Sequence, residues 1–423
     1  MISARRAAYD ALTAITKNGA YTALALKEHI PGGLPNEDKK FASMLVRTTL
    51  ENLLRIDYAL NQQIRSKRVH GSVRNILRLG ACQILYMNVE DYAAVSESVK
   101  LMKQLKPQMS GFVNAVLRTL IRNKYSIIYP RGENVQALSI AYSYPIWICE
   151  KFVSDFGFDF TKALFSYSAQ KGTAVRMNPL RTDPVAFEQE LDALGFDFEQ
   201  GSIAHSYTIK GLSDIENLNV YKKGWIAIQS ESAMRAVIQT GIRHGDRLLD
   251  CCAAPGGKSA YAAALADNTL DILAFDIHPH RVKMTMKNYE RLAVKKTRVK
   301  KHDASIFEPC LAKAFDVVIV DAPCSAMGLM AKNPDIRYIR TLNDIAELSN
   351  KQYDILSTCA RYVKAGGTLA YYTCSINREE NEQVTDKFIN NHAGYEYKYE
   401  PMTLYPHIHG SDGFYIAVIQ RKS

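Results

Sequence analysis

The stretch LLDCCAAPGGK, residues 248–258, decides the fold class of this 423-residue chain. Its apolar start is typical of a strand, its small residues and two glycines favour a tight turn, and residues 259–265 can continue as a helix. Glycines allow main-chain N–H groups to point toward a ligand, and the N-terminus of a helix favours a carboxylate or a phosphate. A turn without a ligand would have a similar sequence, so the surrounding residues must decide between a binding site and a structural turn.

The region after residue 230 has the pattern of a parallel sheet covered on both faces, because apolar runs alternate with helical segments. We predict an α/β Rossmann-like domain over residues 230–423. Its strands are expected at residues 247–250, 272–276, 298–301, 315–321, 367–373 and 414–420.

Two regions with different patterns precede this domain. Residues 1–125 repeat apolar positions three and four apart, for example within residues 73–84, and we interpret these positions as the core of an all-helical domain. Residues 126–229 combine turn residues with short apolar pieces and predict a small α+β subdomain. The chain is therefore expected to be multidomain, with boundaries near residues 125 and 229.

The charge of the chain is uneven. The formal net charge is +10, and residues 1–125 contain 19 Lys and Arg against 9 Asp and Glu, which leaves 34 of each sign in the rest. A basic helical domain suits a polyanion such as RNA, because each neutralised phosphate releases counterions. A solvated helical surface is the alternative, and charge alone does not decide between them.

Composition excludes several classes of protein. Hydrophobic residues make up 47% and charged residues 23%, as in globular proteins, and no apolar run approaches the roughly 20 residues of a membrane span. The eight cysteines are sparse and include no pair of C-x-x-C motifs, so we expect neither disulfides nor a metal site. We expect a cytoplasmic protein without a membrane partner.

Acidic residues follow two of the expected strands. Asp276 ends the strand after the glycine turn, about 20 residues further on, where a carboxylate can accept both hydroxyls of a ribose. Asp303 follows the next strand and can contact an adenine, or it can cap a following helix. The spacing of Asp276 favours a nucleotide-like cofactor at the turn.

Four motifs, in order along the chain, resemble those of the RNA cytosine-5 methyltransferases, the Sun family: DCCAAPGGK at 250–258, DAPCS at 321–325, NPDIR at 333–337 and TCSI at 373–376. The resemblance implies a class I methyltransferase domain that uses S-adenosyl-L-methionine, with the methionine carboxylate of the cofactor at the glycine turn. The predicted cofactor contacts are Cys252, Ala253, Ala254, Pro255, Gly256, Gly257, Lys258, Asp276, Arg281, Asp303 and Asp321.

The reaction that this resemblance implies needs a thiolate. C5 of cytosine is a poor nucleophile until another nucleophile adds at C6, and a thiolate is suited to that addition. By resemblance, Cys374 attacks C6 and Cys324 assists the breakdown of the adduct. Asp321 would contact the cytosine edge, and Lys258 would stabilise the site electrostatically.

The remaining cysteines need no chemistry to explain them. Free cysteine usually behaves as a small buried hydrophobe, and we interpret Cys82, Cys149, Cys310 and Cys359 in this way. Cys251 and Cys252 lie in the glycine turn, where small side chains are needed. The chain departs from the family at Ala326, where glycine is common, and the Cβ of alanine restricts the φ angle of that loop.

The N-terminal region carries a second resemblance. RLGA at 78–81, AVSESV at 94–99 and GFVNAVLR at 111–118 are similar to the NusB-like RNA-binding domain. Together with the cysteine motifs, this domain marks the bacterial RsmB (Fmu/Sun) type, which methylates one cytosine in 16S ribosomal RNA. The resemblance implies 16S rRNA as the partner, no DNA, and a monomer.

A second basic cluster is open to two interpretations. Its members are Lys295, Lys296, Arg298, Lys300 and Lys301. They can form an RNA-binding patch beside the cofactor crevice, or they can protect the edge of a sheet from pairing with other chains.

Three other functions would each need a different set of these features. A non-catalytic RNA-binding protein would need neither the cysteines nor the cofactor turn. A DNA cytosine-5 methyltransferase uses the Pro-Cys cysteine as its nucleophile, which would reverse the roles of Cys324 and Cys374. A small-molecule methyltransferase explains neither the basic domain nor the paired cysteines.

Overall fold

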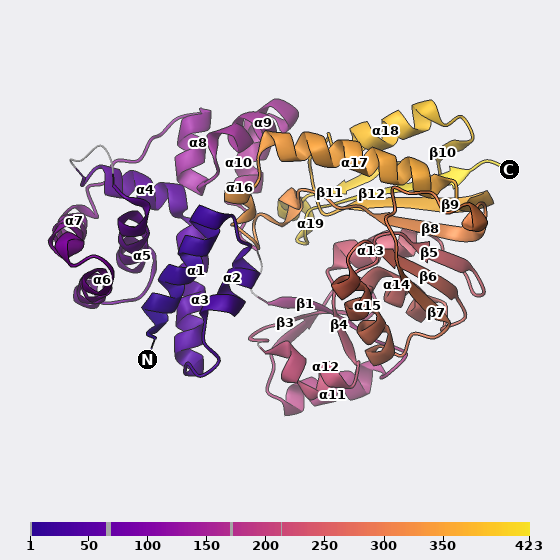
Figure 1. Ribbon diagram of the computed structural model, residues 1–423, viewed down its shortest axis with the longest axis horizontal. Helices are drawn as coiled ribbons and strands as arrows, with labels where there is room; N and C mark the ends of the chain where they lie inside the picture. The colour runs from indigo at the N-terminus through magenta and orange to yellow at the C-terminus, as the bar shows by residue number, and fades with distance from the viewer. Residues whose placement is uncertain (1, 65–68, 170–171, 213) are drawn as a thin grey trace. The chain divides into compact units, whose positions relative to one another are not determined.

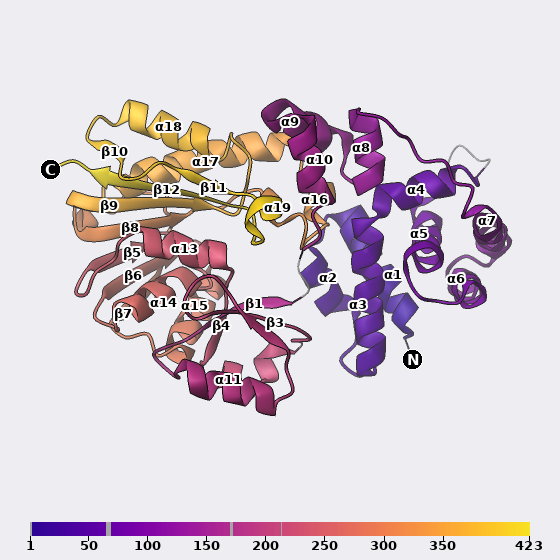
Figure 2. The ribbon, with the colours of Figure 1, turned by 180° about the vertical axis from the view of Figure 1, so that it is seen from behind.

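The computed structural model describes residues 2–64, 69–169, 172–212 and 214–423. The chain forms two compact units, which Figures 1 and 2 show from opposite sides. The helical unit consists of Met1–Tyr167 and Met330–Thr341, and the α/β unit consists of Ser168–Leu329 and Leu342–Ser423. The first unit extends to Tyr167, beyond residue 125, because the helices within residues 135–166 pack with one another and with the helix at residues 53–61.

The helical unit has the all-α architecture that the sequence predicts. Its α-helices are α1 (Ala4–Asn18), α2 (Thr22–His29), α3 (Asn36–Glu51), α4 (Leu53–Asn61), α5 (Gly71–Tyr86), α6 (Asp91–Leu105), α7 (Ser110–Asn123), α8 (Val135–Tyr142), α9 (Ile146–Phe156), α10 (Phe158–Ser166) and α16 (Ile336–Ile339), with a 3-10 turn, η1 (Pro107–Met109), before α7.

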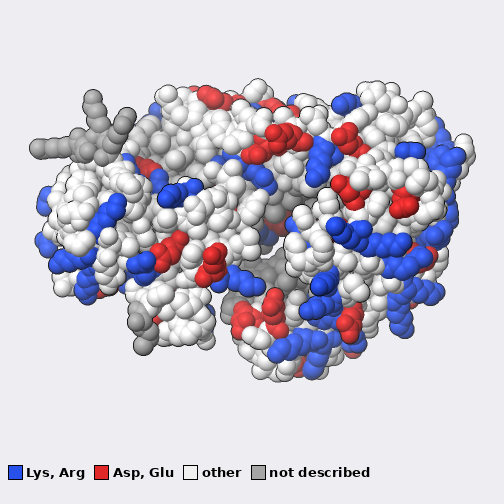
Figure 3. Space-filling view, in the orientation of Figure 1, with Lys and Arg blue, Asp and Glu red and all other residues white. Residues whose placement is uncertain are grey.

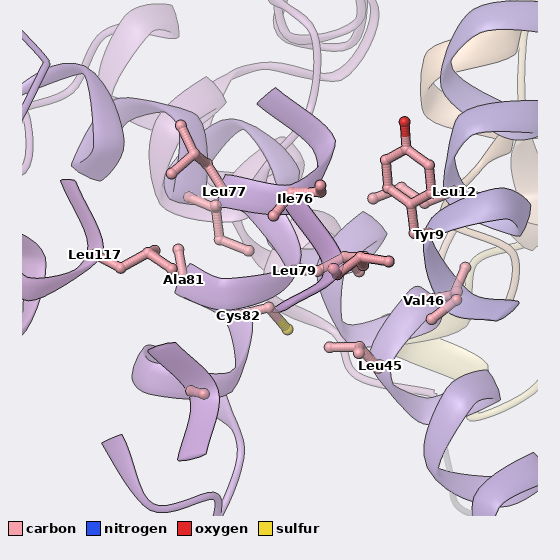
Figure 4. Packing of buried hydrophobic residues seen from close by; sticks show 14 of the residues in the cluster. Tyr9, Leu12, Leu45, Val46, Ile76, Leu77, Leu79, Ala81, Cys82 and Leu117 are labelled. Carbon is pink, nitrogen blue, oxygen red and sulfur yellow. The ribbon is translucent and has the colours of Figure 1, made fainter. Parts of the chain in front are cut away.

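The core of the helical unit surrounds α5. This helix packs against α1, α3 and α7, and Figure 4 shows its Ile76 and Leu79 directed toward Leu12 of α1 and Val46 of α3. All four side chains are at most 3% exposed. The three-to-four spacing of apolar residues therefore marks core positions, as predicted.

Residues 330–341 lie in the helical unit although the residues directly before them, up to Leu329, belong to the α/β unit. The guanidinium of Arg337 donates to the carbonyl oxygens of Met330 and Tyr142 and lies 3.9 Å from the ring centroid of Tyr144. A carboxylate oxygen of Asp335 accepts a hydrogen bond from the N–H of Thr22, at the start of α2. The NPDIR motif is thus a structural part of the helical unit.

A small antiparallel sheet forms the first part of the α/β unit. Its strand order is β2-β3-β1-β4, formed by β1 (Thr173–Met177), β2 (Phe198–Gln200), β3 (Ser206–Ile209) and β4 (Ile226–Ile228). The helices α11 (Pro184–Ala193) and α12 (Asn219–Lys222) accompany it, with the 3-10 turn η2 (Ile215–Asn217). A separate apolar cluster, which includes Val175, Phe187 and Tyr207, forms its core.

The large sheet has the strand order β10-β12-β9-β8-β5-β6-β7, with β11 paired to β12. Strands β5 to β9 run parallel, and β10, β11 and β12 add antiparallel pairs. The strands are β5 (Arg247–Asp250), β6 (Asp271–Asp276), β7 (Thr297–Lys301), β8 (Phe315–Asp321), β9 (Val363–Thr373), β10 (Tyr395–Tyr397), β11 (Met402–Leu404) and β12 (Phe414–Arg421). The six strands expected from the sequence are all present.

Helices cover both faces of this sheet, with α17 and α18 on one side and α13, α14 and α15 on the other (Figures 1 and 2). The elements are α13 (Glu231–Gln239), α14 (Gly257–Leu265), α15 (Pro279–Arg291), α17 (Leu342–Ala360), α18 (Glu382–Asn391) and α19 (Pro406–His409), with 3-10 turns η3 (Pro309–Leu311) and η4 (Met327–Leu329). The predicted Rossmann-like fold is confirmed.

The strand order reverses direction between β5 and β8. From β5 the chain proceeds outward to β6 and β7, and then returns to β8 on the other side of β5. In open parallel sheets, ligands bind outside the carboxyl ends of the strands at such a point. The loops that follow β5, β8 and β9 are therefore the place to look for a site.

Candidate active site

The glycine turn follows β5 and leads into the N-terminus of α14. Gly256 has a φ of +91°, and a Cβ at this position would lie 2.8 Å from a ring carbon of Tyr289 and 3.0 Å from a methyl carbon of Thr285. Only glycine fits both the backbone angle and the space. The Ala254–Pro255 peptide bond within the turn is cis.

Asp250, the last residue of β5, is a buried acid that the sequence analysis did not single out. Its side chain is 1% exposed, and neither carboxylate oxygen makes a regular hydrogen bond with a described residue. Burial raises the pKa of Asp250 to about 7, while the nearby Ser259 hydroxyl acts in the opposite direction. A buried carboxyl group of this kind, directly before the glycine turn, is available to a cationic group of a ligand.

Asp276 and Asp303 lie where the sequence places them, after neighbouring strands. Asp276 is buried at the end of β6, accepts a hydrogen bond from the N–H of His278, and has Arg281 Nη1 at 3.9 Å. The carboxylate of Asp303 accepts hydrogen bonds from the N–H and hydroxyl of Ser305, which lower its pKa. A turn rather than a helix follows Asp303, so it is not a helix cap.

Asp321 and Lys258 form an ion pair between the end of β8 and the first turn of α14. Burial disfavours the charged ammonium of Lys258, but the charge of Asp321 and its hydrogen bond outweigh burial, so that the pKa of Lys258 is raised. Asp250 and Cys374 also favour the ammonium. Lys258 therefore carries a permanent positive charge next to the ends of β5 and β8.

The two cysteines meet at the ends of neighbouring parallel strands. Cys324 follows β8 and Cys374 follows β9, and their Sγ atoms are 3.1 Å apart. The interaction with Cys374 and burial raise the pKa of Cys324 well above that of a free thiol. Two negative charges at this distance would repel strongly, so the pair does not carry both at once.

Main-chain contacts join the two cysteine loops. The N–H of Gly328 donates to the carbonyl oxygen of Cys374 at 3.0 Å, and the N–H of Gly413 donates to that of Gly328 at 3.0 Å. A Cβ on Gly328 would lie 2.2 Å from the Gly413 oxygen. Ala326, the departure from the family pattern, has a φ of +61°, which is the left-handed conformation that glycine adopts more easily.

Glu380 is a further residue that sequence reasoning missed. It lies between β9 and α18, is fully buried, and accepts hydrogen bonds from residues of both cysteine loops. Its position five residues after the Cys-Ser pair was a possible signal, but glutamate near a helix start is common in sequences. Only the folded chain shows what it contacts.

The other cysteines divide into two groups. Cys82, Cys149 and Cys359 are fully buried, as expected, and Cys251 is 1% exposed. The interpretation of Cys310 as a packed residue is wrong, because it lies exposed in the 3-10 turn η3 with its Sγ 3.6 Å from a carboxylate oxygen of Glu308.

A groove of about 600 Å³ lies on the helical unit, between α6 and α7. Basic side chains from both helices line it, namely Lys100, Lys103, Arg118 and Arg122. Its acidic residue, Asp91, forms an ion pair with Lys124, and Tyr92 at its rim is 79% exposed. Figure 3 shows Lys and Arg side chains over this part of the unit.

The second basic cluster lies on β7, an edge strand of the large sheet. Figure 3 shows basic side chains gathered in this region, and Arg298 forms an ion pair with Asp271. The position on an edge fits the protective role that was one of the two interpretations.

Among the described residues, no group of three or more His, Cys, Asp or Glu side chains is arranged to hold a metal ion. In the same part of the chain, no helix is both long enough and apolar enough to cross a membrane.

Comparison with known proteins gives a consistent result. The family described as 16S rRNA methyltransferase RsmB/F matches residues 238–420, and the NusB family matches residues 2–122. A probable ribosomal RNA small subunit methyltransferase B from Bacillus subtilis strain 168 is 30% identical over 99% of both chains. The chain belongs to the ribosomal RNA small subunit methyltransferase B family. A family member from Proteus mirabilis is also 30% identical, over 94% of this chain and 95% of that one.

Solved structures support the fold. The protein PH0851 aligns with a TM-score of 0.82 over 98% of both chains at 23% identity. NSun6 from Pyrococcus horikoshii, crystallised with the S-adenosylmethionine analogue SFG, aligns with a TM-score of 0.59 over 65% of this chain and 97% of that one, at 19% identity.

The family uses S-adenosyl-L-methionine, and the residues of this chain fit it. The glycine turn leaves backbone N–H groups at the start of α14 for a carboxylate. The buried carboxyl group of Asp250, which makes no regular hydrogen bond with a described residue, suits the amino group of the methionine part, and Asp276 lies at the end of the next strand. When bound there, the cofactor supplies an electrophilic methyl group.

Proposed function

We propose that this protein transfers a methyl group from S-adenosyl-L-methionine to C5 of a cytosine in 16S ribosomal RNA through a covalent adduct with Cys374. The observation that carries the proposal is the pair of sulfurs 3.1 Å apart, beside the point where the strand order reverses. Family membership makes the protein an S-adenosylmethionine-dependent rRNA methyltransferase. Cytosine, the C5 atom and the cysteine adduct are the further parts of the proposal.

In this reaction the thiolate of Cys374 adds to C6 of the cytosine, which makes C5 nucleophilic. S-adenosyl-L-methionine, which residues 252–258 would hold, would supply the methyl group that C5 takes up, and the bond from that methyl carbon to the sulfonium sulfur would break. A base removes the proton from C5, the C5–C6 double bond forms again, and the bond between C6 and the Cys374 sulfur breaks. The thiolate is regenerated and the methylated base leaves.

Cys324 has the complementary role. Its raised pKa keeps Cys324 in the thiol form. A protonated sulfur next to the nucleophile can assist the breakdown of the adduct, because a proton near the leaving thiolate stabilises it.

Asp321 and Lys258 complete the proposed catalytic group. A carboxylate at Asp321 can accept a hydrogen bond from the exocyclic amine of cytosine, and Lys258 holds that carboxylate in place through the ion pair between β8 and α14. The ammonium of Lys258 also places a positive charge in the electrostatic environment of Cys374.

The proposed cofactor contacts are those of the sequence analysis, with Asp250 added. Residues 252–258 would contact the methionine part, Asp276 the ribose hydroxyls, and Asp303 the adenine end. Arg281, which lies near Asp276, would orient that carboxylate. Asp303 has one carboxylate oxygen engaged with Ser305, which leaves the other for a ligand.

The groove between α6 and α7 is the proposed RNA contact of the helical unit. Four basic side chains can neutralise phosphates, and the exposed ring of Tyr92 can stack on an unpaired base. Holding an extruded base costs a few kcal/mol, which such additional contacts can offset. We propose that the protein acts as a monomer, in the cytoplasm where rRNA is assembled into subunits, on RNA and not on DNA.

The direct test is methyl transfer. Purified protein is incubated with 16S rRNA, free or in partly assembled subunits, together with methyl-labelled S-adenosylmethionine, and 5-methylcytosine is mapped in the product. Label at C5 of one cytosine is expected. No transfer to any form of the RNA would favour a non-catalytic RNA-binding protein.

The roles of the cysteines have their own test. We expect Cys374→Ala to abolish both methylation and adduct formation, whereas Cys324→Ala should let a covalent RNA–protein complex accumulate on denaturing gels. The reverse pattern would assign the nucleophile to Cys324, as in DNA cytosine-5 methyltransferases.

A further inference from the structure

The carboxylate of Glu380 has an unusual number of hydrogen-bond donors around it. Oε1 accepts from the N–H of Ser325 at 2.7 Å and from Nε2 of Gln352 at 3.1 Å. Oε2 accepts from the hydroxyls of Ser325 at 2.5 Å and Ser375 at 2.6 Å, and from Nδ2 of Asn377 at 2.9 Å. The two oxygens thus have five donors.

These donors come from both cysteine loops. Ser325 directly follows Cys324, and Ser375 directly follows Cys374. Gln352 of α17 also donates to the carbonyl oxygen of Pro323, on the other side of Cys324, at 2.9 Å. Glu380 therefore connects the chain on both sides of one cysteine with the chain next to the other.

Burial makes this arrangement depend on the carboxylate. Glu380, Ser325, Ser375, Asn377 and Gln352 are all fully buried. Among the described residues, no lysine or arginine forms an ion pair with Glu380, so hydrogen bonds rather than a counter-charge hold it. A buried donor without an acceptor is costly, so replacing the carboxylate should make the loops move rather than leave the donors unpaired.

We propose that Glu380 is a positioning residue that holds Cys324 and Cys374 at the distance and orientation that the methyl transfer needs. It touches neither thiol. Its negative charge contributes, after the interaction with Cys374 and burial, to the raised pKa of Cys324. The proposal rests on the proposed function in that the two cysteines act on one base.

The first experiment compares Glu380→Gln with the wild type. Glutamine has nearly the same shape but replaces one acceptor oxygen with a donor, which would face the donors of Ser325, Ser375 and Asn377. We expect kcat for rRNA methylation to fall about 100-fold, the loss typical of a misplaced reacting group. The KM for RNA and the affinity for S-adenosylmethionine should change less than about threefold, because neither ligand contacts Glu380.

A second measurement reports on the sulfurs without any methylation. Phenylarsine oxide reacts with two neighbouring thiols, forms two As–S bonds and releases its oxygen as water with the two thiol protons. The Cys324→Ala variant gives the background from other cysteines. We expect wild-type protein to bind one arsenical above this background, and Glu380→Gln to bind at least tenfold more slowly.

Two further variants keep the proposal testable if Glu380→Gln does not fold. Ser375→Ala removes one donor and leaves the carboxylate, and we expect a smaller loss of kcat and slower arsenical binding. Glu400→Gln, an exposed glutamate of the same unit, is the matched control and should behave as the wild type.

The possible results separate cleanly. The proposal would be overturned if folded Glu380→Gln shows the kcat and the arsenical binding of the wild type. If Glu380→Gln does not fold, the same result in Ser375→Ala would overturn it. A loss of cofactor affinity equal to the loss of kcat would also overturn it, because the role would then be structural. If Cys374→Ala remains active, the proposed function fails, whereas the arsenical result still tests the role of Glu380.

Discussion

The core of the helical unit and the cluster around Glu380 are both fully buried, but different forces hold them together. Leu12, Val46 and Leu77 contribute non-directional apolar contacts. Glu380 and Ser375 contribute directional hydrogen bonds with one favourable geometry. The difference indicates that changes in the apolar core should lower stability, whereas changes in the polar cluster should lower the rate of catalysis.

The largest expected effect on stability is that of Leu77→Ala. Leu77 is buried in the core, with 0% of its surface exposed to solvent. Replacing a buried leucine with alanine costs about 2–5 kcal/mol of stability. Chemical denaturation should show this loss, while methylation at low temperature should stay near that of the wild type. A large loss of kcat in the folded variant would contradict the expectation that changes in the apolar core lower stability rather than the rate of catalysis.

The next effect concerns Asp250, a buried acidic group. Its pKa of about 7 in the folded protein lies above the ordinary value of 3.8, so the unfolded chain gives up this proton at lower pH. As pH rises from about 4 to about 7, the group therefore reduces stability. We expect Asp250→Asn to raise the Tm at pH 8 and to leave it nearly unchanged at pH 4.

The same substitution should act in the opposite direction on the cofactor. If the ionised carboxylate pairs with the amino group, the wild-type affinity for S-adenosylmethionine should weaken below about pH 7. Asp250→Asn should bind about tenfold more weakly at pH 8, as expected for a lost charged hydrogen bond, and with little dependence on pH. Calorimetric titration at several pH values measures this, and an unchanged affinity would exclude the contact.

A smaller effect is expected in the groove of the helical unit, which is neither core nor active site. Lys103→Ala combined with Arg118→Ala should weaken RNA binding several-fold and reduce the slope of log affinity against log salt by about 2, one for each lost phosphate contact. The kcat at saturating RNA should not change. Lys17→Ala, at an exposed position of α1, is the control, and an equal effect there would indicate non-specific attraction.

The smallest effect is that of Ala326→Gly in the Cys324 loop. Alanine at a φ of +61° is strained, and glycine should relieve up to about 1 kcal/mol, offset in part by its greater freedom in the unfolded chain. We expect a rise in Tm of at most a few degrees and nearly unchanged kcat. A clear fall in stability would mean that the Cβ of Ala326 contributes packing.

Much of the fold could be predicted because its signals are local. β5 and β8 have the predicted bounds, since an apolar run between turn residues specifies a strand without knowledge of its neighbours. The glycine turn and both Cys-Ser pairs are short sequences whose chemistry is evident from the residues themselves. The helical periodicity of residues 73–84 likewise gave the core of α5.

The amino-acid sequence by itself thus determined the fold class, the family and the residues from which we infer the chemistry. Only the tertiary structure decided that residues 330–341 join the helical unit, that Cys310 is exposed, and that Asp250 is buried. It also brought Glu380 to Ser325, 55 positions earlier in the chain. The physical reason is that burial and hydrogen bonding depend on which strands lie side by side, and the pairing of β8 with β9 joins segments that are distant in sequence.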